Sequence, residues 1–281
     1  MIKRKLFYLL PQSWRPAVRR LYYLPIDLWD LLLGRRDAFT PPKGKNFVGS
    51  GDFKSEGELT MKYLIEWGGL KPSDRVLEVG SGIGRKAVPL MSFINDNGSY
   101  DGFDIVKDGI QWCKKKITTH RKNFNFIHAD IYNDLYNKAG KIKSQEYIFP
   151  YKDAQFDFVF LTSVFTHMTD GEVLHYLSEI QRVLRPNGTL FITWFIWNEL
   201  TELNEKDGVT DKNFPYNLGH YRLMDKAVEA ANVAYNEEWL RKIYLQNNFA
   251  ITEPIRYGWW RGIAKDNDYQ DTIIAKKKTH H

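Results

Sequence analysis

The stretch Val76-Leu-Glu-Val-Gly-Ser-Gly-Ile-Gly84 decides the fold of this chain. It starts inside an expected buried strand, residues 75–79, and ends with three glycines at alternate positions. Glycine lets the backbone turn sharply and lets a ligand approach to contact distance. We expect a helix to begin near residues 84–85, so that its free N–H groups face that ligand. On the glycines alone, the loop fits either a ligand site or a purely structural turn.

Strands and helices alternate around this stretch. The expected strands are residues 75–79, 98–104, 123–128, 156–161, 189–196, 250–256 and 271–276. The expected helices are residues 55–67, 85–94, 108–119, 171–184 and 236–246. Such alternation is typical of parallel βαβ units with right-handed crossovers, whereas the last two strands have no helix between them and indicate an antiparallel edge. The sequence therefore predicts an α/β fold built on a doubly wound, mostly parallel sheet.

Two acidic residues stand where the second and third strands end. Asp104 follows Gly84 by twenty residues, at a strand end from which a carboxylate can accept hydrogen bonds from ribose hydroxyls. Asp130 ends the third strand, where a carboxylate can accept from an adenine amino group. Ile105 and Ile131 follow the two acids directly and can hold a purine between apolar faces. This edge of the sheet is therefore an expected nucleoside site.

Glu78 helps to separate two kinds of nucleotide cofactor. A buried carboxylate needs a cation or a hydrogen-bond donor, which the α-amino group of a ligand would supply directly or through water. A nicotinamide dinucleotide oxidoreductase would instead need G-x-G-x-x-G/A, but counting from Gly80 the last position holds Arg85. The third glycine comes one residue too early, and a pyrophosphate gains little from Glu78. The three acidic residues, Glu78, Asp104 and Asp130, therefore favour a cofactor with an amino-acid tail over a dinucleotide.

The chain resembles the class I S-adenosylmethionine-dependent methyltransferases over residues 74–276. The motifs that carry the resemblance are Leu-Glu-Val-Gly-Ser-Gly-Ile-Gly84, Gly-Phe-Asp104, His-Ala-Asp130, Phe-Asp-Phe-Val-Phe-Leu-Thr-Ser-Val-Phe-Thr-His167 and Glu179-Ile-Gln-Arg-Val-Leu-Arg-Pro-Asn-Gly188. The resemblance implies a Rossmann-like, seven-stranded sheet with an antiparallel last strand. It also implies S-adenosyl-L-methionine as the cofactor and S-adenosyl-L-homocysteine as its product.

The same resemblance assigns cofactor-binding positions. It implies that the glycine loop holds the methionine part, that Asp104 and Asp130 hold ribose and adenine, and that Thr162 lies beside the cofactor. The complete expected set is Glu78, Gly80, Ser81, Gly82, Gly84, Asp104, Ile105, Asp130, Ile131 and Thr162.

His167 is the residue that we expect to act as a general base. It follows the fourth strand, whose carboxyl end opens onto the crevice where ligands bind in such sheets. Imidazole titrates in a useful range, and a base is needed only when the nucleophile arrives protonated. The alternative is that His167 hydrogen-bonds a loop carbonyl and orders the segment. No metal site is expected, because the histidines are scattered and Cys113 has no cysteine partner.

Several other side chains have two open interpretations. Arg85 either approaches the carboxylate of the cofactor or forms a surface salt bridge. Phe53 and residues 47–51 either fold over the methionine end or form a linker turn. The tryptophans at or beyond strand ends either line the substrate site or pack in the core, and these are Trp194, Trp197, Trp259 and Trp260.

The first 36 residues hold the whole net charge of +6, with eight basic and two acidic residues, against 32 of each in the rest of the chain. A nucleic-acid-binding body is therefore not expected. Residues 1–45 form a basic, aromatic arm and linker, which Pro11, Pro16 and Pro25 limit to short helical pieces. Three roles are open for this arm: it packs on the domain as extra core, it binds anionic lipid headgroups, or it forms an oligomer contact. The single cysteine and the lack of a long apolar tract indicate a cytoplasmic protein, peripheral at the inner membrane face if residues 1–36 touch lipid.

The methyltransferase domain is expected to span residues 46–278, with residues 197–235 as an inserted lid. A lid favours a modest, enclosed acceptor over DNA or RNA, which would need an open basic groove. We therefore expect methyl transfer to an oxygen, less readily to a nitrogen, of a small molecule or glycan. The alternative from another class is an inactive S-adenosylmethionine-binding scaffold or partner subunit.

Overall fold

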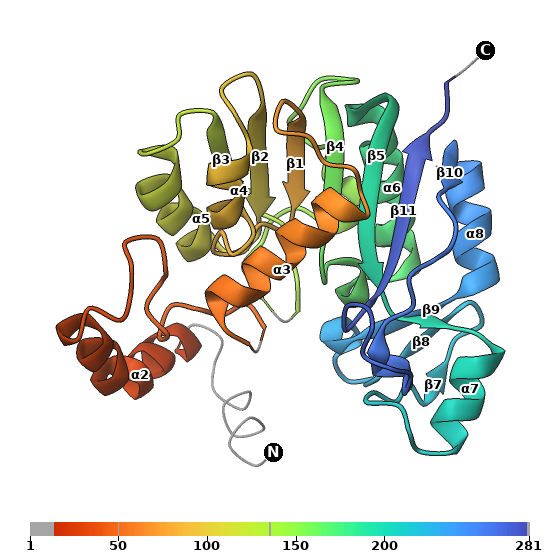
Figure 1. Cartoon of the computed structure of the whole chain (residues 1–281). Coiled ribbons are helices and arrows are strands. Elements are labelled where there is room, and N and C mark those ends of the chain that lie inside the picture. The colour runs from red at the N-terminus through yellow and green to blue at the C-terminus, as the bar shows by residue number, and fades with distance from the viewer. Residues whose placement is uncertain (1–13, 50, 135, 280–281) are drawn as a thin grey trace.

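A seven-stranded sheet is the centre of the chain (Figure 1), for which the computed structural model describes residues 14–49, 51–134 and 136–279. From edge to edge the strands are β10 (Phe249–Ile251), β11 (Asp271–Lys277), β5 (Leu184–Trp194), β4 (Phe156–Leu161), β1 (Arg75–Val79), β2 (Ser99–Asp104) and β3 (Phe124–His128). Neighbours are parallel, except that β11 is antiparallel to both β5 and β10. This confirms the predicted sheet and its antiparallel last strand. Expectations for residues 1–13, residue 50 and residues 280–281 lie outside the described residues.

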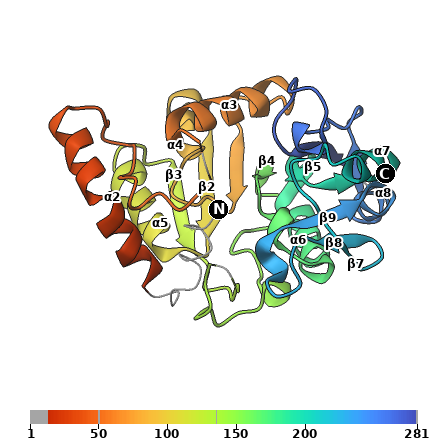
Figure 2. The ribbon, with the colours of Figure 1, turned by 90° about the horizontal axis from the view of Figure 1, so that it is seen from below.

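Helices cover both faces of this sheet (Figure 2). The helices on one face are α3 (Phe53–Glu66), α4 (Ala87–Phe93) and α5 (Lys107–Cys113), and those on the other are α6 (Asp170–Val183) and α8 (Glu237–Gln246). Along β4, Phe158 and Phe160 pack with the first group, whereas Val159 and Leu161 pack with the second. A strand that is buried on both faces needs apolar residues at successive positions, which is why residues 158–161 read as one hydrophobic run.

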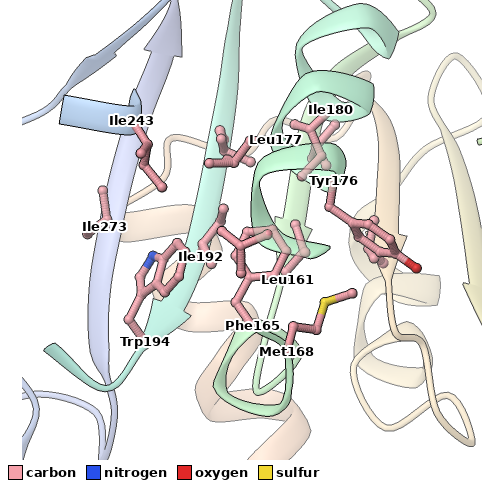
Figure 3. Close-up of a cluster of buried hydrophobic side chains, with 14 of the residues drawn as sticks. Leu161, Phe165, Met168, Tyr176, Leu177, Ile180, Ile192, Trp194, Ile243 and Ile273 are labelled. Atoms are coloured by element: carbon pink, nitrogen blue, oxygen red, sulfur yellow. The ribbon is translucent and has the colours of Figure 1, made fainter. Parts of the chain in front are cut away.

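The larger apolar cluster lies between β4, β5 and α6 (Figure 3). The Phe165 ring lies 4.9 Å from that of Trp194 and 6.3 Å from that of Tyr176, measured between ring centroids. All three side chains are buried, and Met168 closes the same cluster. This packing supports the turn after β4, which carries His167.

Two of the expected helices differ in detail. The helix expected at residues 85–94 begins at Ala87, although the Val88 N–H already donates to the Gly84 carbonyl at 3.0 Å. The helical turn therefore starts next to the last loop glycine, and only the formal boundary moves. The helix expected at residues 108–119 is divided into α5 and a π-helical turn, η1 (Lys114–Thr118).

Residues 197–235, expected as a lid, fold mainly into a second sheet. Its strands, in order, are β6 (Ile196–Trp197), β9 (Val233–Asn236), β8 (Tyr221–Leu223) and β7 (Tyr216–Asn217). The helix α7 (Glu199–Lys206) and the 3-10 turn η4 (Glu229–Ala231) belong to the same insertion. Phe195, Phe214 and Trp260 form its small core. The insertion lies at the end of the main sheet toward which β1, β4 and β5 point (Figure 1).

The described part of the arm is one helix, α2 (Arg15–Leu32), so the prediction of short helical pieces is wrong. Pro16 lies in the first turn, where its missing N–H has no helical partner to lose. Pro25 removes one bond to the carbonyl of Leu21, a residue that is 72% exposed, so that water can satisfy that carbonyl. No residue of α2 is buried, which contradicts the interpretation as extra core. No described helix is long and apolar enough to cross a membrane.

Replacing Phe165 by alanine tests the packing behind the turn after β4. The Phe165→Ala change should lower the free energy of unfolding by about 3–5 kcal/mol in urea denaturation, because it removes a fully buried ring. Leu174→Ala is the control, since Leu174 lies on α6, a helix that packs on the same cluster, but is 39% exposed, and its replacement should cost less than about 1 kcal/mol. Equal losses for both variants would contradict the assignment.

Candidate active site

Three glycines of the loop after β1 adopt left-handed backbone conformations. They are Gly80, Gly82 and Gly84, with φ angles of 79°, 58° and 83°. A Cβ atom at these positions would lie 2.4 Å from Val164, 2.6 Å from Val48 and 2.7 Å from Ile117, respectively. A side chain at any of the three would therefore meet both backbone strain and a steric clash. The alternate spacing seen in the sequence is a physical requirement of this loop.

The glycine loop is tied to the end of β2. The N–H groups of residues 80–81 donate to the Phe103 carbonyl at 2.9 and 3.0 Å. The Asp104 carboxylate accepts from the N–H groups of Gly82 and Val106, each at 2.7 Å. Burial raises the pKa of Asp104, and the two backbone bonds act in the opposite direction. Asp104 therefore fixes the loop, and its oxygens retain further lone pairs for a ligand.

Asp130 stands at the end of the neighbouring strand, β3. The Ala129 N–H donates to the Asp104 backbone carbonyl at 3.0 Å, so the two strand ends that carry the acids are joined directly. The Asp130 carboxylate is partly exposed, and no described residue hydrogen-bonds it. Of the two expected purine walls, Ile131 is buried and Ile105 is partly buried. The structure thus brings all four predicted nucleoside-site residues to one edge of the sheet.

Glu78 is fully buried in β1, and it finds its partners within the protein. The Tyr100 hydroxyl donates to its Oε2, and the Lys86 Nζ lies 3.7 Å from its Oε1. Burial raises the pKa of Glu78 to about 7, while Lys86 and Tyr100 act in the opposite direction. Burial also lowers the pKa of Lys86. Lys86 thus supplies a cation for Glu78 within the protein, while Glu78 Oε1 has no hydrogen-bond partner among the described residues.

Lys86 and Tyr100 are site residues that sequence reasoning missed. Tyr100 lies two positions before Gly102, the residue of β2 that pairs with Glu78. A Cβ atom on Gly102 would lie 3.1 Å from the Tyr100 hydroxyl and 2.8 Å from the Cβ of Ser81. Glycine within a strand marks a close approach of other groups, so Gly102 was the available signal.

The turn after β4 meets the glycine loop through Val164, the close neighbour of Gly80. Within this turn Ser163 has a φ of 57°, which is strained for a residue other than glycine. Its N–H donates to the Thr193 hydroxyl at 2.8 Å, and its own hydroxyl donates to Gln270 at 2.9 Å. These partners lie far away in the sequence, so the sequence could not indicate how the turn is held.

Two hydroxyl groups beside the loop fit the polar groups of a ligand. Ser81 Oγ and Thr162 Oγ1 are both buried, and no described residue hydrogen-bonds either of them. A buried polar group without a partner costs roughly 1–3 kcal/mol, so a ligand that bonds these hydroxyls recovers that energy. With Asp104 and Asp130 nearby, this donor set fits a cofactor that has an amino-acid end and a nucleoside end.

Residues 47–49 fold over the glycine loop. Val48 is the close neighbour of Gly82, as the contact distance above shows. The buried Arg85 guanidinium donates to the Val48 carbonyl and lies 6.0 Å from the centroid of the Phe53 ring. Arg85 therefore fastens residues 47–49 onto the loop, a role that neither sequence interpretation included. The two interpretations of residues 47–51 were a segment that folds over the site and a linker turn. Residues 47–49 match the first, because they cover the glycine loop.

His167 ends the 3-10 turn η3 (Phe165–His167). Its Nδ1 donates to the Ala230 carbonyl of η4 at 2.7 Å, and its ring meets Tyr136 edge-on, with centroids 6.1 Å apart. Burial lowers the pKa of His167, although the bond to Ala230 acts against this shift. The imidazole is therefore neutral at neutral pH, with a proton on Nδ1 and a lone pair on Nε2. The loop-ordering bond is present, and it leaves the Nε2 lone pair for base chemistry.

The four tryptophans divide into two pairs. Trp194 and Trp260 are buried, so core packing is the correct interpretation for them. Trp197 and Trp259 are partly exposed, and each lies close to the cation of a basic side chain.

Comparisons with known proteins agree with this geometry. Residues 76–188 match the family described as "Methyltransferase domain". The chain is 26% identical to the 2-phytyl-1,4-naphthoquinone methyltransferase of Nostoc sp., over 51% of this chain and 57% of that protein. It is 27% identical to the ubiquinone/menaquinone biosynthesis C-methyltransferase of Wigglesworthia glossinidia brevipalpis, over 68% and 73%. Its fold resembles magnesium protoporphyrin IX methyltransferase of Synechocystis, solved with bound S-adenosylhomocysteine (TM-score 0.51, 14% identity, 92% and 99% covered).

Residues 76–188 form a methyltransferase domain of the class I S-adenosylmethionine-dependent type, and S-adenosylmethionine is the cofactor of this domain. The matched residues 76–188 run from β1 into β5 and include the glycine loop and both strand-end acids. The chain covers only 57% of the length of the first of these relatives. Helix α2 and the second sheet lie outside the matched residues.

Removing the Asp104 carboxylate tests its place in the cofactor site. The Asp104→Ala change should weaken S-adenosylhomocysteine binding at least about tenfold in isothermal titration, because charge-assisted bonds to the ligand and the anchor of the loop are both lost. Asp96→Ala serves as the control, since the Asp96 side chain is fully exposed. Unchanged affinity of the Asp104 variant would contradict this placement.

The raised pKa of Glu78 predicts a pH-dependent stability of the apoprotein. The folded state binds this proton more tightly than the unfolded state, because burial raises the pKa of Glu78 from 4.5 to about 7. Its contribution to stability is therefore present below pH 4.5 and is lost as the pH rises through about 7. Relative to Glu78→Gln, the wild-type free energy of unfolding should fall by about 3 kcal/mol across this window.

Urea denaturation of both proteins at several pH values measures this difference. Glu146→Gln is the control, because it removes an exposed carboxylate of the same kind. A difference between wild type and Glu78→Gln that stays constant with pH would contradict the raised pKa.

Proposed function

We propose that this protein transfers a methyl group from S-adenosylmethionine to an oxygen, or in second place a nitrogen, of a small molecule or glycan. The observation that carries the proposal is the state of His167. Its Nδ1–H is engaged by the Ala230 carbonyl at 2.7 Å, and burial lowers the pKa of His167, so a neutral ring offers Nε2 as a proton acceptor. When bound, the cofactor supplies a methyl group on a cationic sulfur.

His167 would accept the proton of an acceptor hydroxyl at Nε2 while Ala230 holds the ring in one orientation. A base of this kind contributes a factor of about 10²–10⁴ to the rate, and it is needed only for a nucleophile that arrives protonated. A hydroxyl group is protonated at neutral pH, which favours oxygen as the atom that is methylated.

We assign the cofactor to the groups that line the loop and the strand ends. Ser81 and Thr162 would bond its amino-acid part, and Asp104 and Asp130 its ribose and adenine. The apolar walls of the adenine would be Ile105 and Ile131. Glu78 would accept a hydrogen bond from the amino end at Oε1, which no described residue hydrogen-bonds. The loop glycines, Gly80, Gly82 and Gly84, allow close approach of the backbone.

The insertion that holds the second sheet supports a small, enclosed acceptor. Its turn η4 contributes Ala230 to the His167 contact, and the Tyr235 hydroxyl on β9 donates to the Met168 carbonyl at 2.7 Å. The insertion is therefore fixed to the turn after β4, where it can exclude water from the reacting groups. Nucleic acid fits this chain less well, because 32 basic and 32 acidic residues balance beyond residue 36.

A panel of hydroxylated acceptors (phenols, quinols and sugars) tests the reaction through release of S-adenosylhomocysteine. Quinols belong in it because two of the curated relatives are named for quinones, one of them as a C-methyltransferase. His167→Ala should lower kcat about 10²-fold or more on any acceptor that the wild type methylates, with cofactor affinity unchanged. The acidic limb of kcat/KM should lie below pH 6.5, since the pKa of His167 is lowered from 6.5.

His175→Gln is the matched control, because His175 also bonds a backbone carbonyl, that of Tyr147 at 2.9 Å. It should retain wild-type turnover. Full turnover by His167→Ala would remove the assignment of the base. Cofactor binding without turnover of any acceptor would favour the alternative, an inactive binding scaffold or partner subunit.

A further inference from the structure

Helix α2 turns its polar face, and not its apolar face, toward the domain. Its least exposed residues form one stripe along the helix, at Arg15, Arg19, Tyr23, Asp27 and Asp30. A surface helix normally turns its apolar stripe toward the protein and its charged residues toward water. In α2 the polar stripe faces the domain instead.

Polar contacts fix this orientation. The Asp27 carboxylate accepts from the N–H groups of residues 43–44 at 2.6 and 3.0 Å. Arg20 forms an ion pair with Asp108, which lies in the first turn of α5. The helix is therefore attached to the domain by charged groups, while its apolar side chains remain outside.

The opposite face of α2 is apolar and exposed. Leu21, Leu24, Leu28 and Leu32 follow the spacing of one helix face and are 72%, 48%, 50% and 79% exposed. Trp29, next to them, is 58% exposed. Single exposed leucines are common, but an apolar stripe along a helix of about 27 Å marks a surface that meets another apolar phase.

Basic side chains lie behind this face. A cavity of about 590 Å³ separates α2 from α5, and its basic lining is Arg15, Arg19, Arg20, Lys45, Lys115 and Lys116. Asp108 is the one carboxylate among the described residues that line it. The Trp112 Nε1 and the Arg19 Nε are buried there, and no described residue accepts a hydrogen bond from either. Cations and N–H donors of this kind match phosphate oxygens.

We propose that α2 is an interfacial helix that binds the surface of an anionic lipid bilayer. Its leucine and tryptophan face enters the boundary between headgroups and acyl chains, and the basic residues contact lipid phosphates. Charge favours lipid over a second copy of this chain, because residues 1–36 carry eight basic and two acidic residues and repel their own kind. The binding does not depend on methyl transfer, so it is tested without any acceptor.

The position of α2 gives this binding a consequence for the site. The helix lies at the end of the molecule toward which β1 and β2 point, as does the second sheet (Figure 1). A protein held at a bilayer through α2 therefore has its glycine-loop end near the lipid.

Co-sedimentation of the full chain with vesicles tests the proposal. We expect binding to a mixture of phosphatidylcholine and phosphatidylglycerol, weak binding to phosphatidylcholine alone, and loss of binding as NaCl rises from about 0.05 to 0.5 M. The triple variant Leu21→Gln, Leu24→Gln and Leu28→Gln keeps good helix formers and should bind the mixture at least about tenfold more weakly.

The matched control changes three leucines of similar exposure elsewhere. Leu200, Leu203 and Leu245 are 52%, 54% and 62% exposed on α7 and α8, and their glutamine variant should bind vesicles like the wild type. A second variant, Arg15→Gln with Arg19→Gln, should bind the anionic mixture at least about fivefold more weakly. Unchanged affinity for S-adenosylhomocysteine shows that each variant is folded.

Equal vesicle binding by the α2 leucine variant and the wild type overturns the proposal. Binding to phosphatidylcholine alone that is as tight as binding to the mixture also overturns it. A third contrary result would come from light scattering. If the wild type binds no vesicles but forms a dimer that the α2 leucine variant does not form, the apolar face belongs to a contact with a second copy.

Discussion

The structure depends on the close approach of separate segments to one glycine loop. Val164, Val48 and Ile117 each occupy the space that a side chain on one of the three loop glycines would need. The turn after β4, residues 47–49 and the helix pair α5–η1 therefore meet at the same short stretch. Because all three glycines have positive φ, backbone strain and packing impose the same residue type. The cofactor site follows from this convergence.

A buried charge pair lies beside that loop. Glu78 and Lys86 come from the strand before the loop and the turn after it, with 3.7 Å between their charged atoms. Such a pair adds little net stability, because each charge loses its hydration. Its effect is to hold a carboxylate of raised pKa beside the glycine loop. The turn that carries His167 reaches the same region from β4.

The parts that the sequence predicted are those encoded locally. Glycine spacing, Asp104 and Asp130 at strand ends, and the alternation of strands and helices follow from short stretches. Lys86 and Tyr100, as partners of Glu78, could not be predicted, because they depend on the register of β1 and β2. The prolines of the arm misled because Pro16 lies in the first turn and Pro25 costs the helix a hydrogen bond without ending it, so α2 continues to Leu32. The second sheet and the inverted α2 rest on contacts between distant segments.

Hydrogen–deuterium exchange, with and without S-adenosylhomocysteine, tests the central claim most directly. The account predicts slower exchange in peptides that cover residues 80–86, 104–106 and 162–164, because the ligand orders the loop and the two strand ends that meet it. Exchange in α2 should stay the same, since that helix lies outside the cofactor set. Unchanged exchange at the loop, or protection confined to other segments, would contradict the account.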